Sequence, residues 1–269
     1  MKERLRHKLH PDVQQALQEA QRLTGHTPVI KRVEHLPHDT HAVLKPPVTT
    51  RQPYEIQYLC AQERLLNHLI VHEVGHIVRL HQVPETERLH TVLTPDARTT
   101  MARQVIRDLT PLLDAGLPEE TAVELISDWH EGVATQLTNF PADLRIEQWI
   151  HDRYPGLRRV QERSLVEEVH RSYPLLSPVI AALTPRVVYQ ATMAMNAAQA
   201  VHVSSLYRHP ELLTPFTQHG WHERGQHLAR LVFDVPDAGH RSDMTTTNAW
   251  ARTLTLTGWF DWQTYTSAR

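Results

Sequence analysis

The sequence predicts an α+β protein that is mostly α-helical, with a small N-terminal sheet, one apolar helix and a helical C-terminal region. Short runs rich in β-branched residues at 28–36 and 42–45 predict the sheet. Apolar residues recur at helical spacing through residues 60–82. From Pro155 onward, helical patterns are separated by proline and glycine.

The N-terminal part is expected to begin with a helix over residues 10–24, because Pro11 stands at an early helical position and apolar residues follow on one side. The two strands come next. Residues 54–59 either add a third strand or lead directly into the following helix.

The helix over residues 60–82 carries an H-E-x-x-H motif, His72-Glu73-Val74-Gly75-His76. Positions i and i+4 lie on one face of a helix, so both imidazoles can reach a single ion. A charged glutamate between them on a buried helix is unfavourable unless a metal or other partners compensate it. We therefore expect His72 and His76 to bind Zn²⁺, with Glu73 as the base that takes a proton from water.

The rest of the chain is expected to be helical. Pro111 should end or kink the first of these helices, and Asn139-Phe140-Pro141 should separate the second from the third. The apolar tail Trp259 to Trp262 should dock on the body of the protein. The helices are expected over residues 97–110, 118–138, 141–154, 157–172, 175–183, 186–207, 222–233 and 242–257.

A catalytic zinc site usually has three protein ligands, and the motif supplies two. Asp143 and Glu147 lie four residues apart beside an apolar stripe, so one can bind the metal while the other orients a histidine. Without a metal, the same pattern is typical of an exposed acidic stripe. Glu124 and Glu131 in the preceding helix are the alternatives. We favour Asp143 or Glu147 because paired acids and an apolar stripe coincide there.

Residues 72–76 resemble the H-E-x-G-H motif of zincin metallopeptidases, in particular the small cytosolic enzymes that cleave phage or stress-response repressors. In that family the third ligand is a glutamate in an E-x-x-A context, which Glu131 to Ala134 resembles. Glu124 to Asp128 is similar to the E-x-x-x-D of thermolysin-like gluzincins, where the glutamate binds zinc.

Residues Asn139 to Glu147 resemble a further pattern, N-x-x-x-D-x-R-x-E, of metallopeptidase-like domains linked to von Willebrand A modules, although no such module is recognisable here. Together the resemblances cover about residues 28–156. They imply a zincin-like metallopeptidase domain over residues 1–156. Residues 157–269 form a helical C-terminal region that can pack on the first as one unit.

The resemblance implies a zinc-dependent peptidase that acts on a protein or peptide substrate. Glu73 would pass its proton to the leaving amine, and His151 or Tyr154 could stabilise the oxyanion. The rival interpretation is a non-catalytic regulatory or protein-binding module on the same scaffold. A third is a helical interaction protein in which the motif is coincidental.

Composition limits the other function classes. A net charge of -2 gives no general attraction to nucleic acid or to an anionic membrane. No apolar run approaches the length of about 20 residues that a membrane span needs. The single cysteine, Cys60, excludes an internal disulfide, and the charged start Met1 to Arg6 does not resemble a signal peptide, so we expect a cytoplasmic protein. The other histidines are mostly expected to be surface residues.

Overall fold

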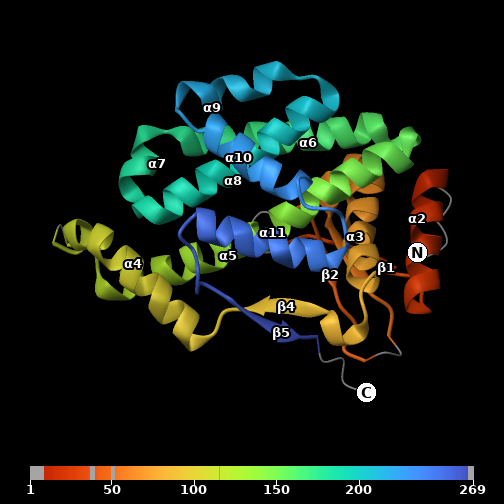
Figure 1. Cartoon of the computed structure of the whole chain (residues 1–269), viewed down its shortest axis with the longest axis horizontal. Helices are drawn as coiled ribbons and strands as arrows, with labels where there is room; N and C mark the ends of the chain where they lie inside the picture. The colour runs from red at the N-terminus through yellow and green to blue at the C-terminus, as the bar shows by residue number, and fades with distance from the viewer. Residues whose placement is uncertain (1–8, 37–39, 50–51, 115, 266–269) are drawn as a thin grey trace.

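The computed structural model describes residues 9–36, 40–49, 52–114 and 116–265. Its N-terminal part has a helix, a three-stranded sheet and the motif helix, in that order (Figure 1). These elements are α2 (Pro11–Thr24), β1 (Val29–Val33), β2 (Ala42–Lys45), β3 (Glu55–Leu59), the 3-10 turn η2 (Cys60–Leu65) and α3 (Leu66–His81). The predicted mostly helical α+β class is confirmed.

The sheet has the order β1-β3-β2, with β3 parallel to β1 and antiparallel to β2. Residues 54–59 therefore contribute the central strand, which settles the alternative left open by the sequence. Ile56, Gln57 and Tyr58 are all buried, as expected for a strand covered on both faces. The edge strand β2 contacts α3.

The motif helix begins later than its apolar pattern suggests. Residues 60–65 form a 3-10 turn, and α3 starts at Leu66. Its apolar side chains pack on α2, on β3 and on the C-terminal half of α5 (Glu119–Arg153). The apolar residues whose spacing predicted the helix are therefore the residues that it buries.

The predicted separation of two helices at Pro141 is wrong, and Pro111 does not end its helix, which was one of the two outcomes predicted for it. Helix α4 (Pro95–Asp114) continues past Pro111, and α5 runs through Pro141 without interruption. A proline inside a helix removes one backbone hydrogen bond and costs about 3 kcal/mol. Burial offsets this cost in α5, where Leu137, Leu144 and Ile150 on either side of Pro141 belong to the cores that α5 shares with its neighbours.

The C-terminal region is helical, as predicted, and α8 passes through its centre (Figure 1). Two short elements between α8 and α10, the 3-10 turn η6 (Pro210–Leu213) and α9, were not predicted. The helices are α6 (Arg158–Ser172), α7 (Pro178–Leu183), α8 (Arg186–Tyr207), α9 (Thr214–Gln218), α10 (His222–Phe233) and α11 (His240–Thr253). Among the helices of the described ranges, none has the length and apolar character of a membrane span.

The segment after α3 and the C-terminal tail pair in a second sheet. β4 (Leu89–Val92) pairs antiparallel with β5 (Asp261–Thr264), and the sequence analysis predicted neither strand. The predicted docking of the C-terminal tail is confirmed, because Trp259 is fully buried. One hydrophobic core joins α4 and α5 to α8, α10 and α11. Residues 1–156 and 157–269 thus share a core.

Candidate metal centre

Helices α3 and α5 pack directly against each other at Gly75 and Ile146. Because glycine has no side chain, the two backbones can approach closely at this point. The approach places the histidines of α3 opposite the acidic residues of α5. Of the predicted site residues, His72, His76, Asp143 and Glu147 are brought together here.

His72, His76 and Asp143 form what we call the inner cluster. The two Nε2 atoms lie 3.3 Å apart. Asp143 Oδ1 lies 3.2 Å from His76 Nε2 and 3.5 Å from His72 Nε2. Tetrahedral zinc with bonds of 2.0–2.1 Å places its ligand atoms about 3.3 Å from one another. The three atoms therefore match one face of a zinc coordination tetrahedron.

Two further properties of the inner cluster fit a metal. Asp143 Oδ1 is buried and makes no hydrogen bond of normal geometry within the described residues, which is unusual for a buried carboxylate. The side chains of His72, His76 and Asp143 keep 20%, 25% and 23% of their surface exposed. Solvent can therefore reach the cluster, as an open coordination position requires.

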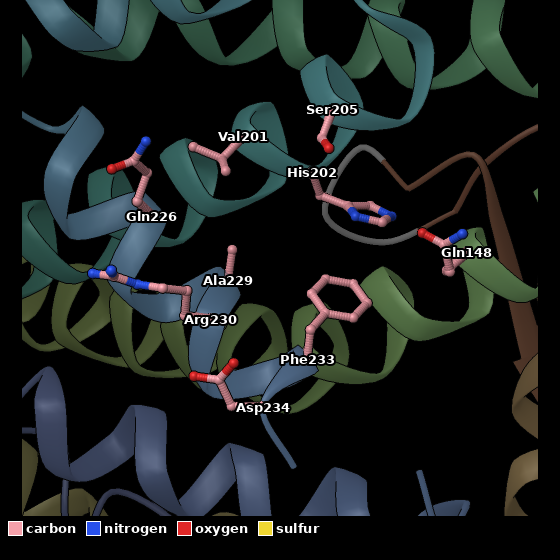
Figure 2. A pocket seen from close by; sticks show the side chains of 9 residues that line it. All are labelled: Gln148, Val201, His202, Ser205, Gln226, Ala229, Arg230, Phe233 and Asp234. Atoms are coloured by element: carbon pink, nitrogen blue, oxygen red, sulfur yellow. The ribbon is translucent and has the colours of Figure 1, made fainter. Parts of the chain in front are cut away.

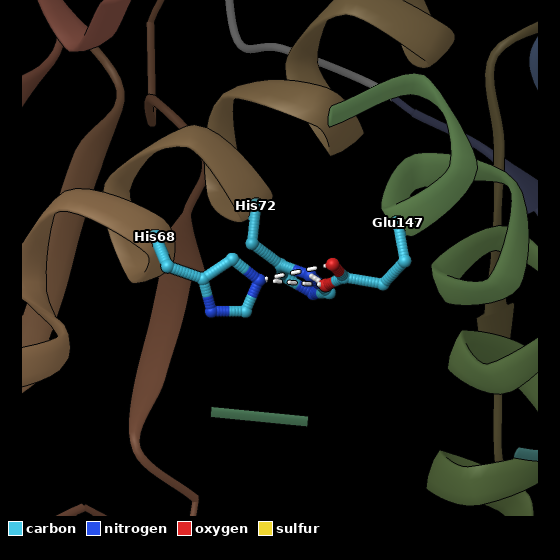
Figure 3. Close-up of side chains that lie close together, drawn as sticks. All are labelled: His68, His72 and Glu147. Carbon is cyan, nitrogen blue, oxygen red and sulfur yellow. Dashed lines mark hydrogen bonds and ion pairs between the residues drawn. The ribbon is translucent and has the colours of Figure 1, made fainter. Parts of the chain in front are cut away.

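Glu147 belongs to a second group, the outer cluster of His68, Glu147 and Gln161. Its Oε1 lies 2.7 Å from His72 Nδ1, and both its oxygens lie 3.0 Å from His68 Nε2 (Figure 3). Since a carboxylate accepts hydrogen bonds, His72 donates its Nδ1–H to Glu147. This leaves His72 Nε2 facing His76 and Asp143. Carboxylates orient metal-binding histidines in the same way.

His68, His72 and Glu147 are also close enough to be considered as a metal site of their own. Their separations argue against it. Distances of 2.7 and 3.0 Å are hydrogen-bond lengths, shorter than the ligand spacing of about 3.3 Å around zinc. Glu147 Oε2 also accepts a hydrogen bond of 2.6 Å from Gln161. The outer cluster is better described as a hydrogen-bonded support for His72.

The charges of the two clusters are coupled. Burial alone would lower the pKa of His72, but Asp143 and Glu147 beside it raise that pKa well above its ordinary value. Burial alone would raise the pKa of Asp143, but His72 and His76 lower it. The imidazoles of His68 and His72 likewise hold the pKa of Glu147 below its usual range in spite of burial. Asp143 and Glu147 are therefore both carboxylates at neutral pH.

Glu73 has a different environment from these acids. Its side chain is buried, and this burial raises its pKa although His72 and His76 oppose the shift. The backbone N–H of Leu44 on β2 also lies close enough to lower this pKa and so opposes the effect of burial. A carboxylate with a raised pKa, next to a candidate metal position, is suited to accept a proton from water and release it again.

The remaining candidate residues lie elsewhere. Glu124 is exposed, and Glu131 precedes Asp143 by twelve residues of continuous helix, or about 18 Å along its axis. Neither belongs to a group that could hold a metal in the described part of the chain. His151 pairs with Asp152, and the hydroxyl of Tyr154 donates to Glu19 of α2, so neither side chain is directed at the inner cluster by its hydrogen bonds.

Comparisons with protein-family models, with curated proteins and with solved structures found no match.

Sequence reasoning missed part of this site. The expectation that the other histidines are mostly surface residues is wrong for His68, His130 and His202, which are all buried. For His68 a signal was present, because His68, His72 and His76 are spaced four residues apart on one helix face. Glu168 of α6 was also missed. Burial raises its pKa, as does the nearby charge of Asp143.

A pocket of about 480 Å³ lies apart from these clusters, between α8, α10 and α5 (Figure 2). His202 and Phe233 stack on one side of it, with their ring centroids 5.1 Å apart. Burial lowers the pKa of His202 to about 4, so its imidazole is neutral at pH 7. The pocket includes Gln148 of α5 but none of the four candidate residues brought together at the centre.

Proposed function

We propose that this chain is a zinc-dependent peptidase of the H-E-x-x-H type, with a zincin-like core. The observation that carries the proposal is the inner cluster, whose three ligand atoms are 3.2–3.5 Å apart with Glu73 beside them. His72, His76 and Asp143 would hold the ion. When bound, Zn²⁺ acidifies water to a pKa near 7 and polarises a carbonyl group.

The protein residues have separate roles in this proposal. Glu73 accepts the proton of the attacking water and gives it to the departing amine nitrogen, so that the peptide bond is cleaved by water with no net change in protons on the enzyme. Glu147 orients His72 by accepting a hydrogen bond from the Nδ1–H of His72. The single cysteine fits the cytoplasmic location that we include in the proposal.

The position of β2 supports a peptide as the substrate. Leu59 N–H donates to the carbonyl of His41, so the alternation of an antiparallel ladder turns the N–H of Leu44 toward the free edge of β2. That N–H lies close enough to Glu73 to lower its pKa, and β2 contacts α3, the helix that carries Glu73. The free edge of the sheet therefore borders the candidate base, and an extended peptide can pair with such an edge.

Glu73→Gln tests the proposal together with His76→Ala. We expect wild type to bind one zinc per chain and to cleave a denatured, unstructured protein such as casein. Glu73→Gln should keep the zinc and lose cleavage, whereas His76→Ala should lose both. Zinc binding without cleavage in wild type would instead favour the non-catalytic binding module. A wild type that binds no zinc would refute the metal site.

A further inference from the structure

Glu147 is held from its far side by residues of the C-terminal region. Gln161 of α6 is fully buried, and its Nε2 donates to the backbone oxygen of Glu147 at 2.8 Å and to Oε2 at 2.6 Å. Tyr207, at the end of α8, donates its hydroxyl to Gln161 Oε1 at 2.6 Å. A chain of hydrogen bonds therefore connects His72, Glu147, Gln161 and Tyr207.

The groups on either side of Gln161, the hydroxyl of Tyr207 and the carboxylate of Glu147, determine which atom donates in each of its hydrogen bonds. Burial raises the pKa of Tyr207, and the charge of Glu147 raises it further, so its hydroxyl stays protonated and donates. Gln161 Oε1 accepts this proton, and its amide nitrogen must then face Glu147. The reversed amide would place Oε1 against the carboxylate and the carbonyl oxygen of Glu147, where no donor is available.

We propose that Gln161 and Tyr207 are positioning residues for the candidate metal centre. They hold the carboxylate of Glu147 where it accepts the Nδ1–H of His72. This hydrogen bond orients the imidazole of His72 so that its Nε2 faces His76 and Asp143. The inference rests on the proposed function for the identity of the metal. It goes beyond the motif, because the two residues come from a region that no motif covers.

Gln161 and Tyr207 matter because the side chain of Glu147 has three rotatable bonds, and its hydrogen bonds decide which conformation it adopts. Without Gln161, the carboxylate of Glu147 would lose one hydrogen bond and its backbone carbonyl oxygen another. The carboxylate would stay buried, which is unfavourable for a charged group. It could then shift toward His68, the donor that remains besides His72 and lies 3.0 Å from both carboxylate oxygens. The hydrogen bond to His72 would weaken, and the imidazole would be less well oriented for a metal.

Two variants test the inference, with a matched control. Gln161→Leu removes the central amide, and Tyr207→Phe removes one hydroxyl with little change in shape. Tyr173→Phe is the control, because the hydroxyl of Tyr173 donates to the carbonyl of Leu212 in the same region. Among the described contacts it makes no hydrogen bond with Glu147, Gln161 or Tyr207. Zinc affinity is measured by competition with a chromophoric chelator. The exchange rate of the His72 Nδ1–H proton is measured by NMR on the metal-free and zinc-loaded protein.

We expect Gln161→Leu to weaken zinc binding about 10- to 100-fold, the usual effect of losing an outer partner, and Tyr207→Phe to weaken it about three- to tenfold. In both variants the His72 Nδ1–H proton should exchange faster, whereas Tyr173→Phe should match wild type. If Gln161→Leu does not fold, the zinc affinity and proton exchange of Tyr207→Phe alone test the inference.

Unchanged affinity and unchanged proton exchange in Tyr207→Phe would overturn the inference. Failure of the proposed function has a different signature, because wild type would then bind no zinc. In that case proton exchange in the metal-free variants still decides whether Gln161 and Tyr207 position His72. The two failures can therefore be told apart.

Discussion

Gly75 of α3 and Ile146 of α5 are so close that a Cβ atom at position 75 would lie 2.5 Å from Cγ2 of Ile146. No real pair of carbon atoms tolerates that distance, and Ile146 is buried and cannot swing into solvent. The glycine of the motif thus has a structural explanation. It sets the distance between the helix that carries His72 and the helix that carries Asp143.

Gly75→Ala should therefore push α3 and α5 apart. We expect a loss of about 1–3 kcal/mol in the free energy of unfolding, typical of overpacking, together with weaker zinc binding. Urea unfolding and chelator competition measure the two effects. Gly132→Ala is the control, since a Cβ there would meet no atom within 4 Å and alanine favours the helix by up to about 1 kcal/mol. Equal behaviour of the two variants would contradict the packing argument.

Substitution of the acids should distinguish the two possible metal groups. If the inner cluster binds the metal, Asp143→Ala should abolish stoichiometric zinc binding, while Glu147→Gln and His68→Gln should weaken it by about 10- to 100-fold or less. Glu131→Gln should have no effect. Zinc content after dialysis and chelator competition provide the measurement. Loss of zinc in His68→Gln with retention in Asp143→Ala would identify the group in Figure 3 as the metal site instead.

The local part of this site could be predicted from the sequence. The four-residue spacings of His72 with His76 and of Asp143 with Glu147 are properties of single helices, and helix geometry turns each pair toward one face. The apolar residues around the motif were sufficient to predict a buried helix. What the spacing left open was which acid faces the two Nε2 atoms, because that depends on how α3 crosses α5.

The remaining parts depend on contacts between distant segments. β4 exists because β5, which follows it by more than 160 residues, pairs with it, and neither strand is distinctive alone. Pro141 is tolerated inside α5 because tertiary packing outweighs its local cost. Gln161 lies in a region with no recognisable motif, and its role is visible once α6 is placed beside Glu147.

Metal binding should stabilise the fold measurably. In the metal-free protein, His72 compensates the carboxylates of Asp143 and Glu147, so we expect this form to be folded. Free zinc at one hundred times its dissociation constant should then raise the free energy of unfolding by about 2.7 kcal/mol. Thermal or urea unfolding with and without zinc tests this. The same addition should leave Asp143→Ala unchanged, and a wild type that does not respond to zinc would argue against the site.

Arg79 lies one turn after His76 on α3. Its buried guanidinium donates to Asp243 in the first turn of α11 and to Asp237 before that helix, with a shortest distance of 2.8 Å to Asp237. It therefore links α3 both to α11 and to the segment that precedes it. Burial alone would raise the pKa of Asp237, but Arg79 lowers it to about 2 from 3.8. A depressed carboxyl pKa stabilises the fold above the unfolded-state pKa, and that contribution is lost as the pH falls through the folded-state value.

Asp237→Asn should therefore destabilise the protein at pH 6, and the deficit relative to wild type should shrink to about half at pH 3. Urea unfolding of both proteins at pH 6, 4 and 3 measures this deficit. Asp234→Asn is the control, because Asp234 is exposed in the same segment and its side chain has no ion pair within the described residues. Its stability should follow wild type at each pH. A deficit in Asp237→Asn that is the same at pH 6 and pH 3 would show that the charge of Asp237 does not stabilise the end of α3.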